Sequence, residues 1–207
     1  MVPGHFSHPF PASSMNPSAS RDASACVASL LNRYSMGIKH LVEPGPSEAQ
    51  LRTIIEAALR APDHGELVPF RFCVIGGAAR SRLADLFEAS AVRRGKNAES
   101  CALERERALR APLLIAVIAR IDLYHPMVPA HEQWACVGGA VTNILNAIHM
   151  LGYAGKMLSG EKVRDAEIIG AFCQPGETLT GWISVGTAAK QPGERRAKPV
   201  DDVLSFF

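Results

Sequence analysis

RAPDHGELVPFRFCVI, residues 60–75, is the stretch that decides the fold of this chain. Its first residues end a helix, because Pro62 cannot continue one and pushes Ala61 toward an extended conformation. A loop follows, and FRFCVIGG at residues 70–77 is expected to form a strand. The loop presents His64, and loops on rigid supports often hold binding groups. A single loop histidine is more often just a solvated side chain, so both interpretations stay open.

Two helices are expected before this stretch. One begins at Ser47, a good N-cap, and Gln50 three residues later completes a capping box. The other covers residues 24–34, SACVASLLNRY. Both carry apolar residues at helical spacing. These are Cys26, Val27, Leu30 and Leu31 in the first helix, and Leu51, Ile54, Ile55, Ala58 and Leu59 in the second.

After the 60–75 stretch, helices and strands alternate along the chain. The run APLLIAVIARI, residues 111–121, is continuously apolar and rich in β-branched residues, which is typical of a strand covered on both faces. Long helices with a few strands between them indicate a layered α+β or α/β domain. The expected helices are 78–95, 97–110, 131–151 and 161–173, and the other expected strands are 153–158 and 179–188.

The ends of the chain differ from this pattern. Residues 1–22 are rich in proline, serine and small residues, which predicts a flexible N-terminal extension. Residues 23–207 are expected to form one domain. The tail from Lys190 is polar until its final LSFF.

Composition excludes several classes of function. The formal net charge of +2 is too small and too dispersed to indicate nucleic-acid binding. The most apolar segment, residues 134–153, carries two asparagines and a histidine, so it predicts a buried helix and not a membrane span. The N-terminus does not resemble a secretory signal. The five cysteines include no CxxC pair, which favours buried free thiols in a reducing, cytoplasmic compartment.

The expected helix over residues 131–151 contains the small residues Gly138, Gly139, Ala140 and Ala147. Small residues let another helix approach closely. The pattern fits dense packing inside one subunit and a subunit interface equally well.

Familiar catalytic motifs are absent from the sequence. There is no GxGxxG, no GxxxxGK[ST] and no GxSxG. His125, His131 and Glu132 form the nearest metal-like cluster, but their spacing matches no tight ligand set, so no metal site is predicted.

Two further segments could bind an anion. NRYS, residues 32–35, offers the donor fork of Arg33 and the hydroxyl of Ser35, which suit a phosphate. A helix end followed by a turn explains the same residues more simply. GKMLSG, residues 155–160, lies between a buried strand and a helix start, where backbone amides could receive an anion or a flavin edge.

Taken together, these segments resemble the nitroreductase family, and most closely its short, single-domain YdjA-like branch. The likeness runs from about Leu30 to Phe207. The supporting stretches are LLNRYS, EPGPSEAQLRTIIEAALRAPDH, VPFRFCVI, RAPLLIAVIA, the EQ of HEQW before GGAV, GYAGKMLSG and the terminal SFF.

The resemblance implies an α+β (α/β sandwich) fold, with a mixed central sheet flanked by helices, in an intertwined homodimer. It also implies two FMN sites in the dimer interface, each built from both subunits. Hydride would pass from NAD(P)H through the flavin to a small acceptor such as a nitroaromatic or a quinone. No protein acid or base is required, so no catalytic residue is assigned.

Site residues follow from the same resemblance. Arg33 and Ser35 match the phosphate-binding Arg-Arg-Ser run of the family, in which Tyr34 takes the place of the second Arg. Arg60 and His64 match positions that reach the flavin from the partner subunit. Met157, Leu158 and Ser159 match a Trp-Arg-Ser segment that lines the cofactor, and Lys156 is a candidate to replace a lost cation.

Two other functions remain open at this point. The departures at positions 34 and 158 fit a flavin-binding or scavenging homodimer with little reductase activity. A third possibility is different chemistry on the same fold, such as dehalogenation or flavin breakdown, although no lid segment for it is evident in the sequence.

Overall fold

The computed structural model describes residues 17–193 and 198–207, with side chains described from residue 23 onward. The chain divides into two compact units, residues 1–33 and residues 34–207. The first unit contains helix α1 (Pro17–Asn32), on which Leu31 is largely exposed. Residues 17–22 of the predicted extension are therefore helical, and residues 1–16 lie outside the described residues.

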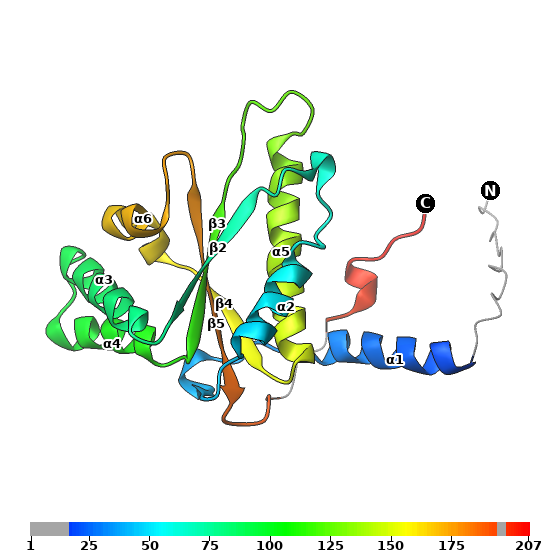
Figure 1. The fold of residues 1–207 in the computed structure, drawn as a ribbon, viewed down its shortest axis with the longest axis horizontal. Helices are drawn as coiled ribbons and strands as arrows, with labels where there is room; N and C mark the ends of the chain where they lie inside the picture. Colours follow the sequence, from blue (N-terminus) through cyan, green and yellow to red (C-terminus); the bar gives the residue numbers. More distant parts are fainter. Residues whose placement is uncertain (1–16, 194–197) are drawn as a thin grey trace, which may run out of the picture. The chain divides into compact units, whose positions relative to one another are not determined.

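The second unit contains the predicted helices and strands in the predicted order (Figure 1). Short 3₁₀ turns connect several of them: η1 (Ile38–His40), η2 (His64–Glu66), η3 (Glu161–Arg164) and η4 (Val200–Asp202). The helices and strands are β1 (Leu41–Val42), α2 (Glu48–Ala58), β2 (Phe70–Gly76), α3 (Ala79–Arg93), α4 (Ala98–Leu109), β3 (Leu113–Ala119), α5 (Ala130–Met150), β4 (Ala154–Leu158), α6 (Ala166–Phe172) and β5 (Thr178–Ala188).

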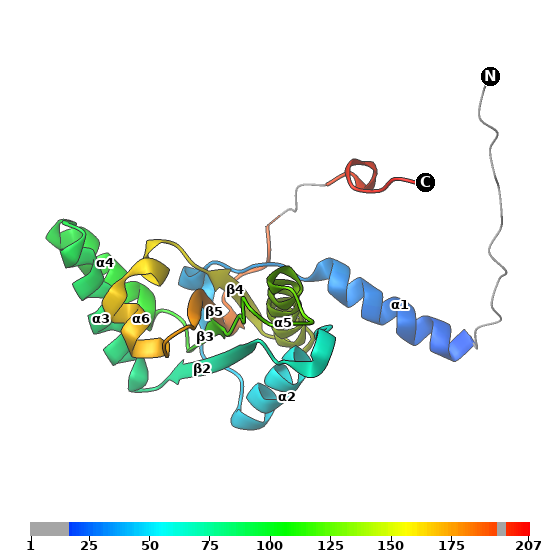
Figure 2. The same ribbon diagram turned by 90° about the horizontal axis from the view of Figure 1, so that it is seen from above.

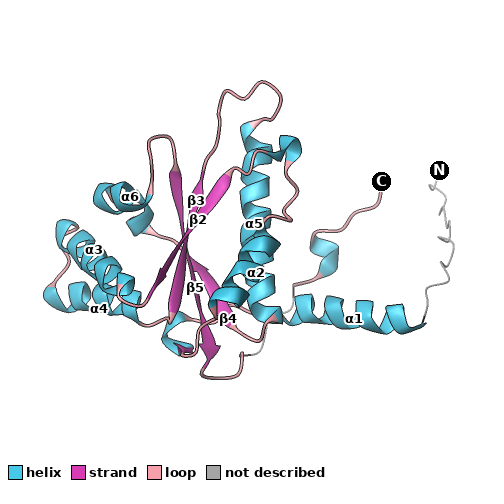
Figure 3. Ribbon diagram, in the orientation of Figure 1, coloured by secondary structure: helices cyan, strands magenta, loops and turns pink. Residues whose placement is uncertain are grey.

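The strands form one five-stranded sheet in the order β1-β5-β3-β2, with β4 also paired to β5 (Figure 3). The ladders between these strands are antiparallel. The parallel pairing expected of a mixed sheet occurs as an isolated bridge between Ser35 and Gly155.

Helices cover both faces of this sheet. Helices α3, α4 and α6 lie on one side, and α2 and α5 lie on the other (Figures 1 and 2). Strand β3 explains the layering, because its residues alternate between two buried clusters: Ile118 belongs to the cluster under α3, and Ile115 to the cluster under α5. The prediction that this strand is covered on both faces is confirmed, and so is the α+β fold.

The capping box of α2 is also confirmed. Ser47 Oγ accepts a hydrogen bond from the Gln50 amide at 3.3 Å, and Gln50 Oε1 accepts one from the Ser47 amide at 2.9 Å. This pair satisfies two backbone donors at the helix start and fixes the beginning of α2.

The small residues of α5 have different roles. A Cβ added at Gly139 would lie 3.3 Å from the Cβ of Ala61, and Ala140 is fully buried, so these two residues serve packing inside the subunit. Gly138 is exposed, and a Cβ added there would meet nothing within 4 Å. Gly138 therefore leaves room for a contact from outside the described subunit, and Ala147 is partly buried against the core under α5.

The cysteines are free thiols in different environments. Cys101 and Cys136 are buried, as expected, but Cys26 is exposed on α1, so the prediction of buried thiols is wrong at that position. Among the described residues, no helix is long and apolar enough to cross a membrane.

Candidate functional site

Two segments that were predicted separately lie side by side. Ser35 forms a parallel bridge with Gly155, and the Met36 amide donates a hydrogen bond to the Gly155 carbonyl at 3.2 Å. A Cβ on Gly155 would lie 2.9 Å from the Ser184 carbonyl oxygen, so β4 can approach β5 this closely only with glycine at position 155. The bridge joins the NRYS and GKMLSG segments into one region.

The first recess of this region, the Ser35 recess, has a volume of about 460 Å³. It carries positive charge, because Lys190 lies in its wall. Burial lowers the pKa of His40, and the charges of Lys190 and Lys39 lower it further. A hydroxyl and a cation in one recess suit an anionic group. The lining residues are Tyr34, Ser35, Met36, Gly37, His40, Lys190, Pro192 and Gly193.

The second recess, the Trp182 recess, has a volume of about 190 Å³ and is mainly apolar. The rings of Phe87 and Trp182 meet edge to face at 5.2 Å. The Nε1 of Trp182 is buried and has no hydrogen-bond partner among the described residues. A bound molecule with an acceptor atom would satisfy this donor. The lining residues are Ile38, Phe87, Arg107, Leu114, Leu158, Ser159, Lys162 and Trp182.

Cations surround the buried carboxylate of Glu104 beside the Trp182 recess. Arg107 donates to Glu104 at 2.6 Å, Lys162 donates to its other oxygen, and Lys96 lies 3.5 Å away. Burial raises the pKa of Glu104, but the hydrogen bond and charge of Lys162, together with the charges of Arg107 and Lys96, outweigh this and lower the pKa overall. Three cations against one carboxylate leave this side of the recess positive.

The other predicted residues near this region are divided between core and surface. The Tyr34 ring packs edge-on against His149, with centroids 5.9 Å apart, and Met157 packs into the core under α5. Lys156 is exposed and lines neither recess. Arg33 belongs to the first unit, where its amide donates to the Leu30 carbonyl at 3.3 Å.

His64 lies at the opposite end of α5. Its Nδ1 is 2.7 Å from Glu132 Oε2, in the first turn of α5, whereas Tyr34 contacts His149 in the last turn. At a rise of about 1.5 Å per residue, these two turns lie roughly 25 Å apart. One copy therefore brings Tyr34, Ser35, Leu158 and Ser159 together but keeps His64 away from them. Arg60 is exposed and lines neither recess.

Sequence reasoning missed the cations of both recesses. Arg107 lies on α4, Lys162 in η3 and Lys190 after β5, so three distant segments supply them. Each is an ordinary basic residue in a polar stretch, and no local signal distinguishes it. Within the described parts of the chain, no group of three or more His, Cys, Asp or Glu residues could hold a metal ion.

Comparison with known proteins identifies the family. The model of the Nitroreductase family matches residues 30–187, most of the chain. The chain belongs to the nitroreductase family. The proposed NAD(P)H nitroreductase YdjA of Escherichia coli (strain K12) is 34% identical over 159 residues, which are 76% of this chain and 85% of that protein. The resemblance to the YdjA-like branch is thereby confirmed.

Solved structures of nitroreductases share the fold. A nitroreductase-like protein from Bacillus cereus superimposes with a TM-score of 0.76 at 18% identity, covering 88% of this chain and 95% of its own. A proposed nitroreductase from Desulfovibrio desulfuricans, solved in complex with FMN, gives a TM-score of 0.66 at 22% identity, covering 92% of this chain and 96% of its own.

Proposed function

We propose that this nitroreductase-family chain is an FMN-dependent oxidoreductase that transfers hydride from NAD(P)H to a small acceptor such as a nitroaromatic or a quinone. The observation that carries the proposal is the Ser35–Gly155 bridge, which joins the two predicted cofactor segments. Family membership and the NAD(P)H nitroreductase name of the YdjA relative support the class of reaction.

The two recesses fit the two ends of FMN. The Ser35 recess offers a hydroxyl and Lys190 to the phosphate. The Trp182 recess offers apolar walls and an unsatisfied N–H to the ring system, which carries acceptor atoms along one edge. Arg33, which precedes Tyr34 in the chain, is proposed as a further phosphate ligand on the strength of the family resemblance.

In this proposal, other cations replace the two family arginines that are absent at positions 34 and 158. Positions 34 and 158 are Tyr and Leu, but Lys190 supplies a cation to the Ser35 recess, and Arg107 and Lys162 supply cations to the Trp182 recess. Each charge-assisted hydrogen bond to a bound group is worth about 1.5–3 kcal/mol. Retention of FMN therefore does not require arginine at 34 or 158, and it is compatible with both the oxidoreductase and the scavenging function.

A homodimer completes the proposed site. His64 lies roughly 25 Å along α5 from the Tyr34–His149 contact, so it can reach a flavin in these recesses only in a second copy of the chain. Arg60 is proposed to reach the same flavin on the strength of the family resemblance. The exposed side of α5 carries Trp134, Gly138 and Thr142, which are spaced one turn apart and offer a face for that copy. We propose that α5 pairs with its counterpart there.

Bound FMN would supply the hydride chemistry. Ser35 and Lys190 hold its phosphate, and the apolar wall of the Trp182 recess excludes water from its ring. Arg107 and Lys162 give that recess a positive field, which favours the extra negative charge of a reduced ring system. These residues bind and orient the cofactor, and none of them has to break a bond.

Spectroscopy of the purified protein tests the proposal. We expect a visible flavin spectrum after incubation with FMN, bleached under anaerobic conditions by NADH or NADPH and restored by a quinone. Binding of flavin without bleaching by either nucleotide would favour the scavenging function instead.

Lys190→Ala tests the phosphate end. It should weaken FMN binding roughly tenfold, or about 1.4 kcal/mol, and leave riboflavin binding unchanged, because riboflavin lacks the phosphate. Lys156→Ala is the matched control, since Lys156 is an exposed lysine outside both recesses. Titration by flavin fluorescence measures all four cases. Equal losses for FMN and riboflavin in Lys190→Ala would place the phosphate elsewhere.

A further inference from the structure

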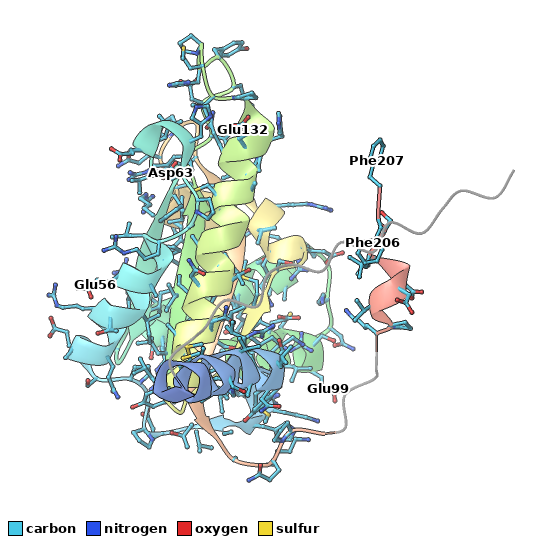
Figure 4. The ribbon with its side chains drawn as sticks, turned by 90° about the vertical axis from the view of Figure 1, so that its right-hand side faces the viewer. Glu56, Asp63, Glu99, Glu132, Phe206 and Phe207 are labelled. Carbon is cyan, nitrogen blue, oxygen red and sulfur yellow. The ribbon has the colours of Figure 1, made fainter. Side chains whose placement is uncertain are left out.

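The loop that carries His64 is fixed at both ends. Asp63 Oδ2 accepts a hydrogen bond from the Val68 amide at 2.7 Å, and the Asp63 carboxylate also accepts one from the Cys136 thiol on α5. Burial raises the pKa of that thiol to about 11, and Asp63 adds to the effect, so the thiol keeps its proton. Asp63 and Glu132 lie near one another at the same end of α5 (Figure 4).

The loop backbone is strained. Glu66 and Val68 have φ values of 52° and 47°, in the left-handed region that side chains rarely adopt. For a β-branched residue such as Val68 this is a genuine outlier. Strain of this kind persists only where the surroundings impose it, and it concentrates at functional sites.

The start of α5 is held equally firmly. The Gln133 side chain donates to the carbonyls of Asp122 and Val128 and accepts from the Asp122 amide, all at 2.8–2.9 Å. Gln133 is buried, whereas its neighbour Glu132 points to the His64 loop. Glu132 and Gln133 therefore have different roles. Gln133 fixes the start of α5, and Glu132 contacts the loop that carries His64.

The His64–Glu132 contact determines which ring nitrogen carries the proton. A carboxylate only accepts hydrogen bonds, so Nδ1 must donate to Glu132 Oε2 across the 2.7 Å contact. Nε2 is then the nitrogen left for another molecule, and it has no hydrogen-bond partner among the described residues. When Nε2 also carries a proton, Nδ1–H still donates to Glu132, so Nε2–H is the bond that faces another molecule.

We propose that Glu132 is a positioning residue that orients His64, and that Nε2 of His64 donates a proton to the oxygen of an acceptor bound in the partner copy's site. The proposal rests on the proposed function and dimer. It adds a proton donor to a reaction for which the sequence required none.

The step balances for a quinone acceptor. The quinone gains a hydride from the proposed NAD(P)H oxidation and needs one further proton. The Nε2–H bond of the imidazolium breaks and an O–H bond forms on the quinone, which becomes a hydroquinone. Solvent returns a proton to the ring, because the His64 side chain is 59% exposed.

Nuclear magnetic resonance of the ring nitrogens tests the positioning role without any cofactor. In the neutral ring of the parent we expect the proton on Nδ1. In Glu132→Leu no side-chain acceptor remains for Nδ1–H, so the proton should move to Nε2. Glu66→Leu is the matched control, since Glu66 lies on the same loop and makes no side-chain hydrogen bond or ion pair within the described residues. An unchanged tautomer in Glu132→Leu would overturn the positioning role.

Stopped-flow kinetics test the proton donor. Glu132→Gln and His64→Gln should slow reoxidation by benzoquinone at least about tenfold more than they slow flavin reduction by NADH or NADPH. Glu66→Gln should match the parent in both steps. Equal reoxidation rates in all four proteins would overturn this inference and leave the proposed function intact. If the parent itself were not bleached, the proposed function would fail first.

Discussion

At the scale of single residues, Glu177 shows how one carboxylate joins distant parts of the chain. Its Oε1 accepts hydrogen bonds from Arg71 at 2.7 Å and from Arg120 at 2.9 Å, and its Oε2 accepts one from the Gln174 amide at 2.8 Å. The hydrogen bond from Arg71 is the main reason that the pKa of Glu177 is lowered to about 2, although burial opposes it. Glu177 therefore stays charged in the folded protein and holds β2 to the turn before β5.

Glu177→Gln should lower the free energy of unfolding by about 1.5–3 kcal/mol at neutral pH. Because the folded pKa lies below the ordinary value of 4.5, the contribution of Glu177 is complete above that value. It is lost as the pH falls from about 4.5 toward 2. Urea unfolding of parent and mutant across this range should show the two curves converging in acid, and a constant difference down to pH 2 would contradict the assignment.

The sequence predicted some of the residues that line the two recesses and missed others for a physical reason. Ser35 and Ser159 were found because they stand in short motifs with a fixed order. Lys190 was missed because its role comes from the three-dimensional approach of the segment after β5 to the Ser35 recess. The partner of His64 could not be predicted either, since Glu132 lies on a different helix.

At the scale of elements, a bulge in β5 positions the end of β4. The β3–β5 pairing shifts between Val117 and Ile118, so that Thr180 has no partner across the ladder. Gly181 follows with a φ of 147°, and a Cβ there would lie 2.2 Å from the Leu158 carbonyl oxygen. The bulge and the glycine together let β4 deliver Leu158 to the Trp182 recess.

Gly181→Ala should therefore separate β4 from β5 and lower the melting temperature by several degrees, since about 1 kcal/mol shifts it by roughly 2–4 °C in a chain of this size. Gly170→Ala is the control. Gly170 is exposed within α6, an added Cβ meets nothing within 4 Å, and alanine favours the helix. Equal melting temperatures for parent and Gly181→Ala would show that the close approach is not required.

Most elements were predictable because their patterns are local. The capping box at Ser47 and the apolar run of β3 each fix one element from its own residues. Strand β1 was missed because two residues cannot display a period. The predicted helix over 161–173 is divided at Asp165, which is extended and caps α6 through the amides of Glu167 and Ile168.

At the scale of the whole molecule, the proposed dimer gives the sharpest test. Obligate interfaces commonly bury more than about 2,000 Å², so we expect sedimentation to show a dimer at micromolar concentration. Gly138→Arg should shift it toward monomer, because a long charged side chain would enter the proposed α5 face. Gly170→Arg should remain dimeric, because α6 lies on the other side of the sheet from α5. The two glycines are matched, since an added Cβ at either one meets nothing within 4 Å among the described residues. A dimer that survives Gly138→Arg unchanged would place the interface elsewhere.

The length of α5 also sets the distance between the His64 contact in its first turn and the Tyr34 contact in its last turn. An insertion of two turns, about seven residues, would keep its buried face in register and lengthen it by roughly 10 Å. The subunit would have to absorb the extra length in the loop before Pro129, because only three residues separate α5 from β4. In the proposed dimer, however, His64 of one copy would no longer reach the recesses of the other. In the proposed dimer, the surface of α5 can therefore vary more freely than its number of turns, because the helix length sets the distance from His64 to the recesses of the partner copy.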